Sequence, residues 1–388
     1  MRILLVGAAD TIFITNYVKS LKNHIDAEVH VYSPFKRLCN YENYPYDYVY
    51  FEDDIVFNSK LMKKIGFLFW PFIQRKRFST FLKNHNTQFD IIHFHRIIPA
   101  WTLRIREYKK YCKKVILTFW GGELDVENIL ASLKLYKYKL GKFIKLSDKV
   151  INTFSDPRYF NLFPEIKEKA IFGQYGSSIV DEMQTVEPSK AKEILGVPSG
   201  SITVLLGYSG KRIHNHIAIL RRIISDVKFE QFKDLMFFIL PMTRGGSEQY
   251  AKDIQYECER AGVKYLLIKD KYFSDRQVAE IRLATDFVFQ LSDFDGLSAS
   301  IKECLCAGSI VITGNWLPYS SLRDLGFVYP EVQDVNEGVS MFYQLLESYP
   351  LSMQSYALNK EIGNHQYSWD NCIVDWVRAY NQITTSEV

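Results

Sequence analysis

Segments typical of β-strands alternate with segments typical of α-helices along nearly the whole chain. The strand-like runs are short, apolar and rich in Val, Ile, Leu and Phe, as buried strands are, and helix-length segments separate them. Such alternation predicts an α/β architecture, with parallel sheets whose strands are joined by crossover helices. The expected strands are 2–6, 27–32, 91–94, 115–119, 149–153, 202–206, 235–240, 263–267, 287–290 and 310–313. The expected helices lie near 13–23, 59–84, 99–111, 127–146, 214–227, 247–262, 275–283, 298–307 and 336–348.

The length of the chain exceeds what one ordinary hydrophobic core organises. Its 388 residues predict two domains, and the stretch 173–200, rich in Gly, Ser and Pro, is the natural boundary. We expect one domain over 1–178, a second over 179–366, and a last amphipathic helix, capped by a serine, over 367–388. In sheets of this kind, ligands bind outside the carboxyl ends of the strands.

Composition narrows the class of protein. A hydrophobic content of 47% and a charged content of 24% are those of a folded globular chain. The 6 cysteines show neither a C-x-x-C pair nor framework spacing, so we expect reduced thiols and no zinc site. The sequence shows no secretory signal and no apolar run of bilayer length. These features predict a cytoplasmic protein, or one bound peripherally to the inner face of the cytoplasmic membrane.

An acidic loop and a short helix stand between the expected strands 287–290 and 310–313. Asp295 and Glu303 are eight residues apart, and Gly296 permits a close approach of the backbone between them. A helix N-terminus attracts anions through its free amides, and carboxylates on either side of a phosphate can accept the hydroxyls of sugar rings. The loop therefore suggests a site for a nucleotide-diphosphate sugar. An ordinary capped helix with two surface acids is the alternative.

This stretch resembles the donor-binding segment of retaining glycosyltransferases of the GT-B fold, family-4 type. Those enzymes carry an E-x7-E pattern, a helix of small residues, a glycine and an apolar strand; here Asp295 and Glu303 precede Ala307, Gly308 and 309–312. The resemblance implies two Rossmann-like domains facing across a cleft, with the last helix crossing back to the N-terminal domain. It implies Asp295 near the donor sugar as a catalytic group. The expected donor contacts in this segment are Gly296, Leu297, Ser298, Ala299, Ser300 and Glu303, with Glu303 on the ribose.

The same loop also spells D-x-D over residues 293–295, the metal-binding signature of the other large glycosyltransferase fold, GT-A. The two-domain layout and the downstream Glu303 favour the GT-B interpretation. On that interpretation the enzyme needs neither a metal ion nor a cofactor, since the nucleotide sugar is its substrate.

A second loop, residues 206–216, carries glycines and cations between a strand and a helix, where backbone amides and positive charge can hold a diphosphate. It is no dinucleotide fingerprint, and a basic surface turn is the alternative. The sequence of this loop, together with that of residues 240–250, is similar to that of the 4-acetamido-4,6-dideoxygalactose transferases of surface-polysaccharide synthesis. The donor contacts expected here are Gly207, Ser209, Gly210, Lys211, Arg212 and Arg244.

Three strand ends in the N-terminal half carry residues suited to an acceptor. The turn Thr118–Asp125 resembles the Thr-x-x-Gly-x-Asp turn of these enzymes, and an indole beside a carboxylate suits a sugar. We expect His95 and Glu123 to be catalytic, although a histidine at a strand end is more often structural. The expected acceptor contacts are Gly7, Asp10, Arg96, Trp120 and Gly121.

The N-terminal half is also strongly basic. Residues 1–180 hold 28 Lys and Arg against 17 Asp and Glu, whereas residues 181–388 hold 20 against 27. Within the first half, 60–83 places aromatics beside cations, a composition that anionic membranes attract; a core helix with a basic outer face is the alternative. Pro71 argues against one uninterrupted helix, and the clustering of the aromatics argues against nucleic acid. The expected membrane contacts are Lys63, Lys64, Phe69, Trp70, Arg75, Lys76 and Arg77.

The function expected from these patterns is a hexosyltransferase-type reaction. A sugar would pass from a nucleotide-diphosphate sugar to a glycan or lipid-linked acceptor in bacterial surface-polysaccharide synthesis, with the retention that the family-4 resemblance implies. A nucleotide-sugar 2-epimerase of the same fold and a catalytically inactive sugar-nucleotide-binding subunit are the alternatives.

Overall fold

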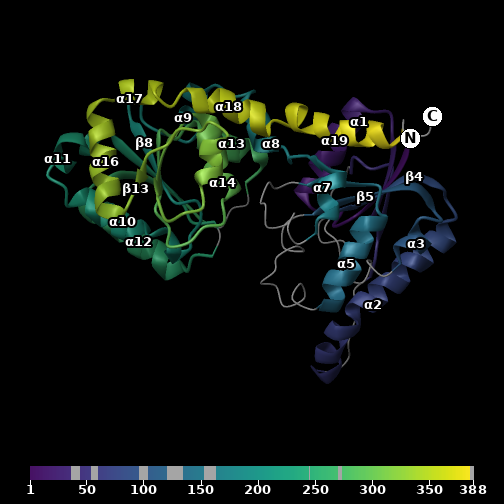
Figure 1. Ribbon diagram of the computed structural model, residues 1–388. Helices are drawn as coiled ribbons and strands as arrows, with labels where there is room; N and C mark the ends of the chain where they lie inside the picture. Colours follow the sequence, from purple (N-terminus) through teal and green to yellow (C-terminus); the bar gives the residue numbers. More distant parts are fainter. Residues whose placement is uncertain are drawn as a thin grey trace. The chain divides into compact units, whose positions relative to one another are not determined.

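The computed structural model describes residues 1–35, 44–53, 60–95, 104–119, 134–152, 163–243, 245–269 and 273–384, without the side chains of 60–71, 134–136 and 152. The chain forms two compact units (Figure 1). Unit 1 comprises Met1–Gly176 and Trp369–Val388, and unit 2 comprises Ser177–Ser368. The boundaries lie two residues from the expected ones at 178/179 and 366/367.

Unit 1 is built on a parallel sheet of seven strands in the order β3-β2-β1-β4-β5-β6-β7. The order reverses between β1 and β4, because β2 and β3 extend the sheet on one side and the later strands extend it on the other. The strands are β1 (Arg2–Val6), β2 (Glu28–Ser33), β3 (Tyr48–Phe51), β4 (Phe89–His95), β5 (Cys112–Phe119), β6 (Lys149–Asn152) and β7 (Ala170–Phe172).

Helices cover both faces of this sheet, so alternate residues of each strand enter two separate cores. Leu4 and Val6 of β1 belong to one core with α2, α3, α5 and α7, and Ile3 and Leu5 belong to the other with α1 and α19. Burial on both faces explains the unbroken apolar run Ile3–Val6 of β1. The helices are α1 (Ile12–His24), α2 (Lys60–His85), α3 (Ile105–Tyr108), α5 (Lys134–Leu146), α7 (Glu165–Lys169) and α19 (Trp369–Thr384).

The sequence predicted a specific feature for each of two helices, α19 and α2. The last helix, α19, packs against α1, β6 and β7, so the C-terminal segment belongs to unit 1 as expected. Contrary to the expectation from Pro71, α2 runs without a break through that position. A proline removes one amide donor from the ladder, and the remaining hydrogen bonds continue the helix on both sides. No helix in the described part of the chain combines the length and apolar composition that crossing a bilayer requires.

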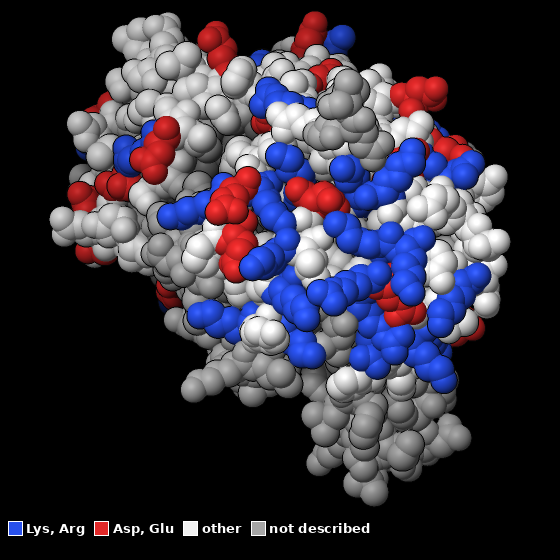
Figure 2. All heavy atoms as spheres, turned by 45° about the vertical axis from the view of Figure 1, so that its right-hand side comes forward, with Lys and Arg blue, Asp and Glu red and all other residues white. Residues whose placement is uncertain are grey.

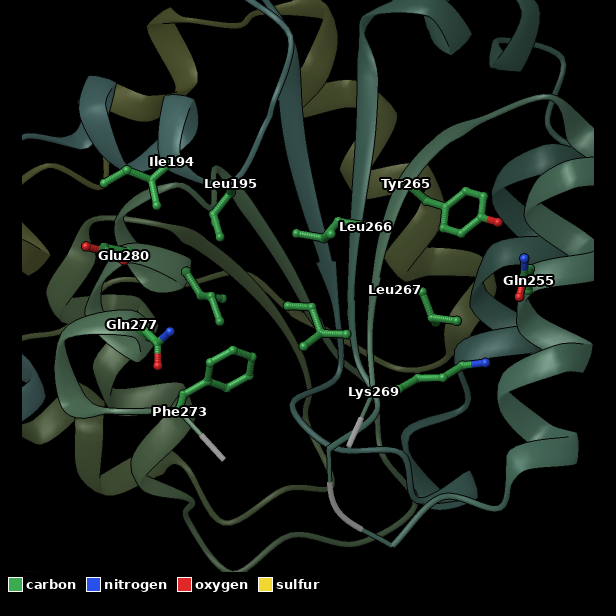
Figure 3. Close-up of a pocket in the computed structure, with 12 residues that line it drawn as sticks. Ile194, Leu195, Gln255, Tyr265, Leu266, Leu267, Lys269, Phe273, Gln277 and Glu280 are labelled. Atoms are coloured by element: carbon green, nitrogen blue, oxygen red, sulfur yellow. The ribbon is translucent and has the colours of Figure 1, made fainter. Parts of the chain in front are cut away.

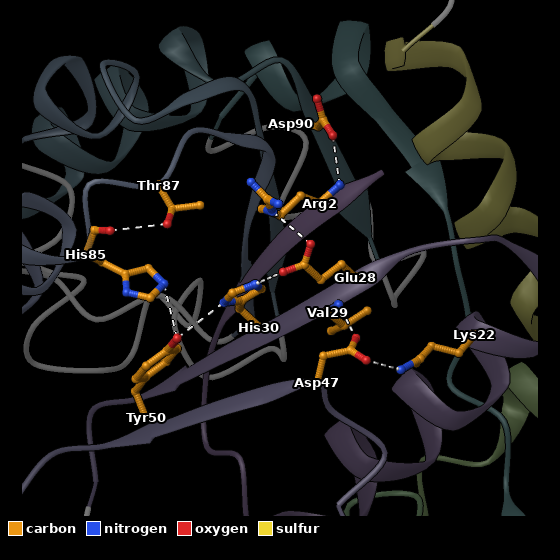
Figure 4. Close-up of polar contacts among 10 residues, drawn as sticks. All are labelled: Arg2, Lys22, Glu28, Val29, His30, Asp47, Tyr50, His85, Thr87 and Asp90. Carbon is orange, nitrogen blue, oxygen red and sulfur yellow. Dashed lines mark hydrogen bonds and ion pairs between the residues drawn. The ribbon is translucent and has the colours of Figure 1, made fainter.

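Polar contacts tie together the amino-end side of the unit 1 sheet (Figure 4). Glu28 on β2 accepts from Arg2 Nε at 2.9 Å and lies 2.8 Å from His30 Nε2. The Tyr50 hydroxyl on β3 lies 3.1 Å from His85 Nε2 at the end of α2 and 3.4 Å from His30 Nδ1. These contacts connect β1, β2, β3 and α2 away from the carboxyl ends of the strands.

Unit 2 repeats this plan with a parallel sheet of six strands in the order β10-β9-β8-β11-β12-β13. The order reverses between β8 and β11, which is where sheets of this type bind ligands. The strands are β8 (Ile202–Leu206), β9 (Met236–Pro241), β10 (Lys264–Ile268), β11 (Phe287–Gln290), β12 (Ile310–Gly314) and β13 (Glu331–Val332).

Two helical layers cover the unit 2 sheet. Val204 and Leu206 pack with α10, α12 and α16, whereas Leu205 packs with α8, α9, α13 and α14. The main helices are α8 (Ser178–Met183), α9 (Pro188–Ile194), α10 (His216–Ile224), α12 (Glu248–Ala261), α13 (Asp275–Leu283), α14 (Ala299–Ala307), α16 (Val335–Glu347) and α18 (Leu358–Tyr367). Shorter helical turns are η2 (Arg212–His214), α11 (Phe229–Phe232), η3 (Lys233–Leu235), α15 (Ser320–Asp324) and α17 (Leu351–Gln354).

Candidate functional site

Two loops meet where the strand order of unit 2 reverses. One follows β8 and the other follows β11, and hydrogen bonds join them. Asn215 Nδ2 donates to Leu291 O at 2.9 Å and to Asp293 Oδ1 at 2.8 Å, and Asp293 N donates to Ile213 O at 2.9 Å. The two segments singled out in the sequence therefore form one structure at the carboxyl ends of adjacent strands.

Asp295 anchors the second of these loops. Its Oδ1 accepts from Tyr208 Oη at 3.0 Å and from Gly296 N at 2.8 Å. Its Oδ2 accepts from Gln290 Nε2 at 2.9 Å and from the Tyr319 hydroxyl. Burial and the Asp295 charge raise the pKa of Tyr208 to about 12, so this hydroxyl stays a donor. Asp295 is 7% exposed and both its oxygens are occupied, which makes it a support of the loop.

The anchored loop presents the N-terminus of α14. Leu297 lies in the left-handed region with φ 64, a conformation that disfavours side chains with a Cβ. Ser298 follows in extended geometry as the N-cap, and its Oγ accepts from Ile301 N at 3.4 Å. The amides of Ala299 and Ser300 have no partner within the helix, as first-turn amides never do. This turn is built like an anion site.

Glu303 lies one turn further along α14 and pairs with an arginine that the sequence did not single out. Its Oε2 is 3.3 Å from Nε of Arg282 on α13, and the two side chains are 8% and 7% exposed. A buried ion pair is favourable only if the hydrogen-bonding positions that the pair leaves open on both side chains also find partners. Both side chains line the same pocket, so a ligand bound there can supply the missing hydrogen-bond partners.

The pocket has a volume of about 440 Å³, which lies in the range of small-ligand sites. It joins the loops after β8 and β9 to the later part of α13 and to the first two turns of α14. Its lining residues are Ile179, Tyr208, Ser209, Lys211, Pro241, Thr243, Phe273, Val278, Ile281, Arg282, Ser298, Ala299, Ser300 and Glu303.

Glycines bring the loops after β8 and β9 close together. A Cβ on Gly210 would stand 2.9 Å from Gly246 Cα, and a Cβ on Gly246 would stand 2.8 Å from Gly210 O. Gly207 has φ 61, and a Cβ there would meet His214 Cβ at 2.8 Å. The sequence predicted Gly207 and Gly210 as donor contacts. The structure shows that the close packing of the loop itself requires them.

The cations of the first loop have different surroundings. Lys211 lines the pocket. Arg212 does not, because its guanidinium stacks 4.4 Å from the Tyr250 ring centroid on α12. Ser209 Oγ also lines the pocket and lies 2.8 Å from His214 Nε2. The predicted contact Arg244 lies outside the described residues.

Two histidines under this loop are buried and neutral. Burial lowers the pKa of His214 to about 4 and that of His216 to about 3. His216 Nδ1 lies 3.3 Å from the Tyr250 hydroxyl. These two histidines therefore serve to support the loop.

In unit 1 the structure gives His95 a packing position. His95 is completely buried, its Nδ1 lies 2.8 Å from the Tyr175 hydroxyl, and burial lowers its pKa to about 3. A Cβ on Gly7 would stand 3.2 Å from His95 Cβ, so Gly7 also serves packing. His95 is thus enclosed by the packing of unit 1, and its expected catalytic role stays a prediction. Asp10 accepts from the Tyr44 hydroxyl.

Several other residues of unit 1 that we expected to be functional lie wholly or partly outside the described residues. Arg96, Trp120, Gly121 and Glu123 lie outside the described residues, as do the side chains of Lys63, Lys64, Phe69 and Trp70.

A basic surface covers one side of unit 1. Figure 2 shows Lys and Arg side chains gathered there, with fewer Asp and Glu among them. The described segments 72–85, 104–114, 137–149 and 163–169, which include parts of α2 and α5 and all of α3 and α7, hold 17 Lys and Arg against 4 Asp and Glu. We call these segments the basic layer. Arg75, Lys76 and Arg77 belong to it.

Several Lys and Arg side chains of the basic layer have no acidic partner among the described residues. Arg104 pairs with Glu107 at 2.6 Å and Lys109 with Asp148 at 3.1 Å. In the described parts of the chain, the following have no Asp or Glu within ion-pair distance: Lys76, Arg106, Lys110, Lys114, Lys137, Lys139, Lys142 and Lys145.

Solved structures are similar to this chain over its whole length. A glycosyltransferase from Rickettsia africae matches with a TM-score of 0.67 at 14% identity, covering 100% of this chain and 99% of that one. HepE from Anabaena, solved in complex with UDP, matches with 0.63 at 12%, covering 98% and 100%. A UDP-forming trehalose-phosphate synthase from Burkholderia xenovorans matches with 0.63 at 12%, covering 99% and 100%. No protein-family model and no curated protein matches the chain.

These likenesses establish the fold. Two parallel-sheet α/β domains, each with helices on both faces, match GT-B glycosyltransferases at full coverage. The predicted fold class is thereby confirmed.

Proposed function

We propose that this chain is a glycosyltransferase that moves a sugar from a nucleotide-diphosphate sugar to an acceptor hydroxyl. The pocket of unit 2 carries the proposal, because free amides of α14, Lys211 and the Glu303–Arg282 pair converge on it. This is a combination of anion-binding and hydroxyl-binding groups in a space of about 440 Å³. Its position, at the point where the strand order reverses, is where open α/β sheets bind nucleotides.

Each group has a role in the proposed reaction. Lys211 and the amides of Ala299 and Ser300 hold the diphosphate and stabilise the negative charge that grows on it as the sugar departs. Glu303 accepts the ribose hydroxyls, and Arg282 holds that carboxylate in place. The nucleotide diphosphate is then the leaving group, and the acceptor oxygen forms the new bond to the anomeric carbon.

Asp295 acts in this proposal as a positioning residue. Four protein donors occupy its oxygens, so it fixes the turn at Gly296 and Leu297 that aims the α14 amides. His95 and Glu123 remain the groups proposed for catalysis on the acceptor side.

The finer assignment draws on the comparisons and on the resemblance. HepE was solved with UDP and with UDP-glucose, which favours a uridine diphosphate donor. The family-4 pattern favours retention at the anomeric carbon, and the aminosugar-transferase wording favours surface-polysaccharide synthesis with a glycan or lipid-linked acceptor.

A nucleotide-sugar panel tests the proposal. The protein is incubated with UDP-, GDP- and dTDP-sugars, with and without acceptor mixtures, and the products are separated. Acceptor-dependent release of nucleoside diphosphate is the expected result. An isomerised nucleotide sugar would indicate a 2-epimerase, and binding without turnover would indicate a binding subunit.

We also propose that the basic layer holds unit 1 on an anionic membrane, where a lipid-linked acceptor resides. Each cation near such a surface contributes about 1 kcal/mol, and the contribution falls with salt. Replacing Arg75, Lys76 and Arg77 by Gln should lower binding to vesicles containing phosphatidylglycerol at least about tenfold.

The matched control for this test lies in unit 2. Replacing the exposed Lys190, Lys252 and Lys360 by Gln removes the same charge and should leave vesicle binding unchanged. If the parent protein does not bind anionic vesicles at low salt, the membrane proposal is refuted and the glycosyl-transfer proposal is unaffected.

A further inference from the structure

A serine hydroxyl in the wall of the unit 2 pocket lies against a buried histidine. Ser209 and Lys211 both line the pocket. Ser209 is 4% exposed, and its Oγ lies 2.8 Å from Nε2 of His214. A hydroxyl donates one hydrogen bond and can accept others, so its hydrogen can point toward the histidine or into the pocket. The position of the proton on the histidine ring decides between these two arrangements.

The ring of His214 is held in one place. It is 1% exposed and packs edge-to-face with the Tyr208 ring, with the two centroids 4.4 Å apart. A Cβ on Gly207 would stand 3.0 Å from Cγ of His214, so the glycine leaves room for the ring. The His214 amide donates to Lys211 O at 3.2 Å, which closes the turn that carries Lys211. These contacts keep Nε2 beside the Ser209 hydroxyl.

The two nitrogens of this ring have different surroundings. Nε2 faces Ser209 Oγ, whereas Nδ1 is buried and has no hydrogen-bond partner among the described residues. Burial lowers the pKa of His214 to about 4, so the ring is neutral at neutral pH and carries its proton on one nitrogen. A proton on Nδ1 would be a buried donor without an acceptor, and such donors are rare in proteins. The surroundings therefore assign the proton to Nε2, from which it is donated to Ser209 Oγ.

A hydroxyl that accepts from a histidine keeps its own hydrogen for another partner. With Nε2–H directed at its oxygen, Ser209 cannot donate to His214, and its hydrogen is available to a ligand in the pocket. The neighbouring groups are donors as well, namely the Lys211 ammonium and the amides of Ala299 and Ser300 in the first turn of α14. An anionic oxygen, which only accepts, satisfies all of these donors together.

We propose that His214 is a positioning residue that fixes the Ser209 hydroxyl as a hydrogen-bond donor to the diphosphate of the nucleotide sugar. This role rests on the proposed function, since the ligand is the one proposed for the same pocket. His214 does not touch the ligand; it occupies a lone pair of Ser209 Oγ and so directs the hydroxyl hydrogen into the pocket. A donor oriented before binding loses less conformational freedom when the ligand arrives. It also disfavours a ligand that presents a donor of its own at this position.

A second pocket of unit 2 lacks this arrangement and supplies a control. It follows β10 and has a volume of about 690 Å³ (Figure 3). The described residues that line it include no serine or threonine, and Lys269 is the one Lys or Arg among them. The Tyr265 hydroxyl in this lining donates to Glu259 Oε1 at 3.1 Å. Tyr265→Phe therefore removes a hydroxyl from unit 2 without removing a donor from the first pocket.

Nuclear magnetic resonance of the histidine rings tests the position of the proton without any ligand. Long-range proton–nitrogen correlation spectra of the full chain distinguish a ring protonated on Nε2 from one protonated on Nδ1. The signals that disappear in His214→Gln identify this residue. We expect His214 to carry its proton on Nε2 at neutral pH. A ring protonated on Nδ1 would overturn the proposal, because Ser209 would then donate to the histidine and not to the ligand.

Calorimetric titration tests the contact between Ser209 and the diphosphate. UDP, GDP and dTDP are titrated into the parent, and the one that binds most tightly is compared with its nucleoside, which has no phosphate. Ser209→Ala should weaken binding of the diphosphate about tenfold, as expected for one hydrogen bond to a charged group, and leave binding of the nucleoside unchanged. Tyr265→Phe should bind both ligands like the parent.

Two results of this titration would overturn the proposal in different ways. A parent that binds none of the three diphosphates would refute the proposed function, and the role of Ser209 with it. A parent that binds one of them, together with equal affinity in Ser209→Ala, would refute the role of Ser209 and leave the proposed function standing.

A double-variant cycle tests whether His214 acts through Ser209. His214→Leu keeps an apolar side chain against Tyr208 and removes the donor, so affinity for the diphosphate should fall several-fold. His214→Gln carries an amide donor at about the reach of Nε2 and should retain most of the affinity. In the Ser209→Ala background, His214→Leu should cause no further loss. An equal loss in both backgrounds would mean that His214 only supports the fold of the loop, and the proposal would fail.

Discussion

Substitutions at different residues of the pocket affect binding and stability to different degrees. Glu303 and Arg282 are a buried pair, so removing one partner leaves the other charge unpaired, at a cost of about 3–5 kcal/mol. A truncation to alanine would therefore mix binding with stability. Gln at position 303 keeps the size and an acceptor and removes only the charge.

We predict that Glu303→Gln weakens UDP binding at least about tenfold, because a charged acceptor of ribose hydroxyls becomes a neutral one. Isothermal titration calorimetry with UDP measures the change. The control is Glu257→Gln, which neutralises a buried glutamate paired with Arg221 outside the pocket. Equal UDP affinity in parent and Glu303→Gln would remove Glu303 from the site.

The Asp295 network gives a second prediction at this scale. Asp295→Asn keeps the shape but faces the Tyr208 and Tyr319 hydroxyls with one acceptor fewer. Unfolding of unit 2 should become easier by about 1–3 kcal/mol. Because the variant loosens the turn that aims the α14 amides, kcat should fall more than KM rises. A variant with normal stability and normal kcat would show that the loop does not depend on this anchor.

At the scale of elements, the sequence predicted the central parts of both sheets. β1, β8, β11 and α13 match their expected ranges, because strands buried on both faces and a capped amphipathic helix leave strong patterns. The edge strand β13, of 2 residues, was missed, since so short a run leaves no pattern. α8 and α9 were read as linker; neither has a side-chain cap, and their packing on α13 holds them.

The candidate site shows the same limit. Glu303, Lys211 and the α14 turn could be found from spacing within one segment. Arg282 and Tyr319 could not, because they reach the pocket loops only through folding from 21 and 24 residues away. The burial of His95 could not be predicted either, because a strand-end position does not reveal that Tyr17, Tyr175 and Trp376 enclose the ring.

The contact between the loops after β8 and β9 gives a prediction for these elements. Gly210→Ala places a Cβ 2.9 Å from Gly246 Cα, so the loops must move apart and Lys211 must move with them. UDP affinity should fall several-fold while the fold is kept. Gly141→Ala in α5, whose Cβ would find an ordinary contact at 3.8 Å, is the control. Unchanged UDP affinity in Gly210→Ala would show that the close approach serves packing alone.

For the whole molecule, buried neutral histidines in both units link stability to pH. Burial lowers the pKa of His95 and His216 to about 3 and that of His214 to about 4, and it lowers the pKa of His93 well below its usual value. The unfolded chain has ordinary histidines with a pKa near 6.5. As pH falls below that value, the unfolded state gains protons first, and the native state loses stability.

We therefore predict full stability above about pH 6.5 and a steady loss down to about pH 4, of up to about 1.4 kcal/mol per pH unit for each such histidine. Two lie in each unit, so both units should weaken together. Calorimetric unfolding at intervals between pH 7.5 and 4.5 measures this. An unfolding temperature that stays constant between pH 7 and 5 would mean that these histidines are not buried and neutral.

The return of α19 to unit 1 has a consequence for how the protein is made. Trp376 and Tyr380 are completely buried, and the Tyr380 hydroxyl reaches both Tyr17 and His93. A ribosome releases these 16 helical residues after all of unit 2. During synthesis, unit 1 must therefore wait with one face of its sheet covered by α1 but not by α19, while unit 2 already has its complete chain.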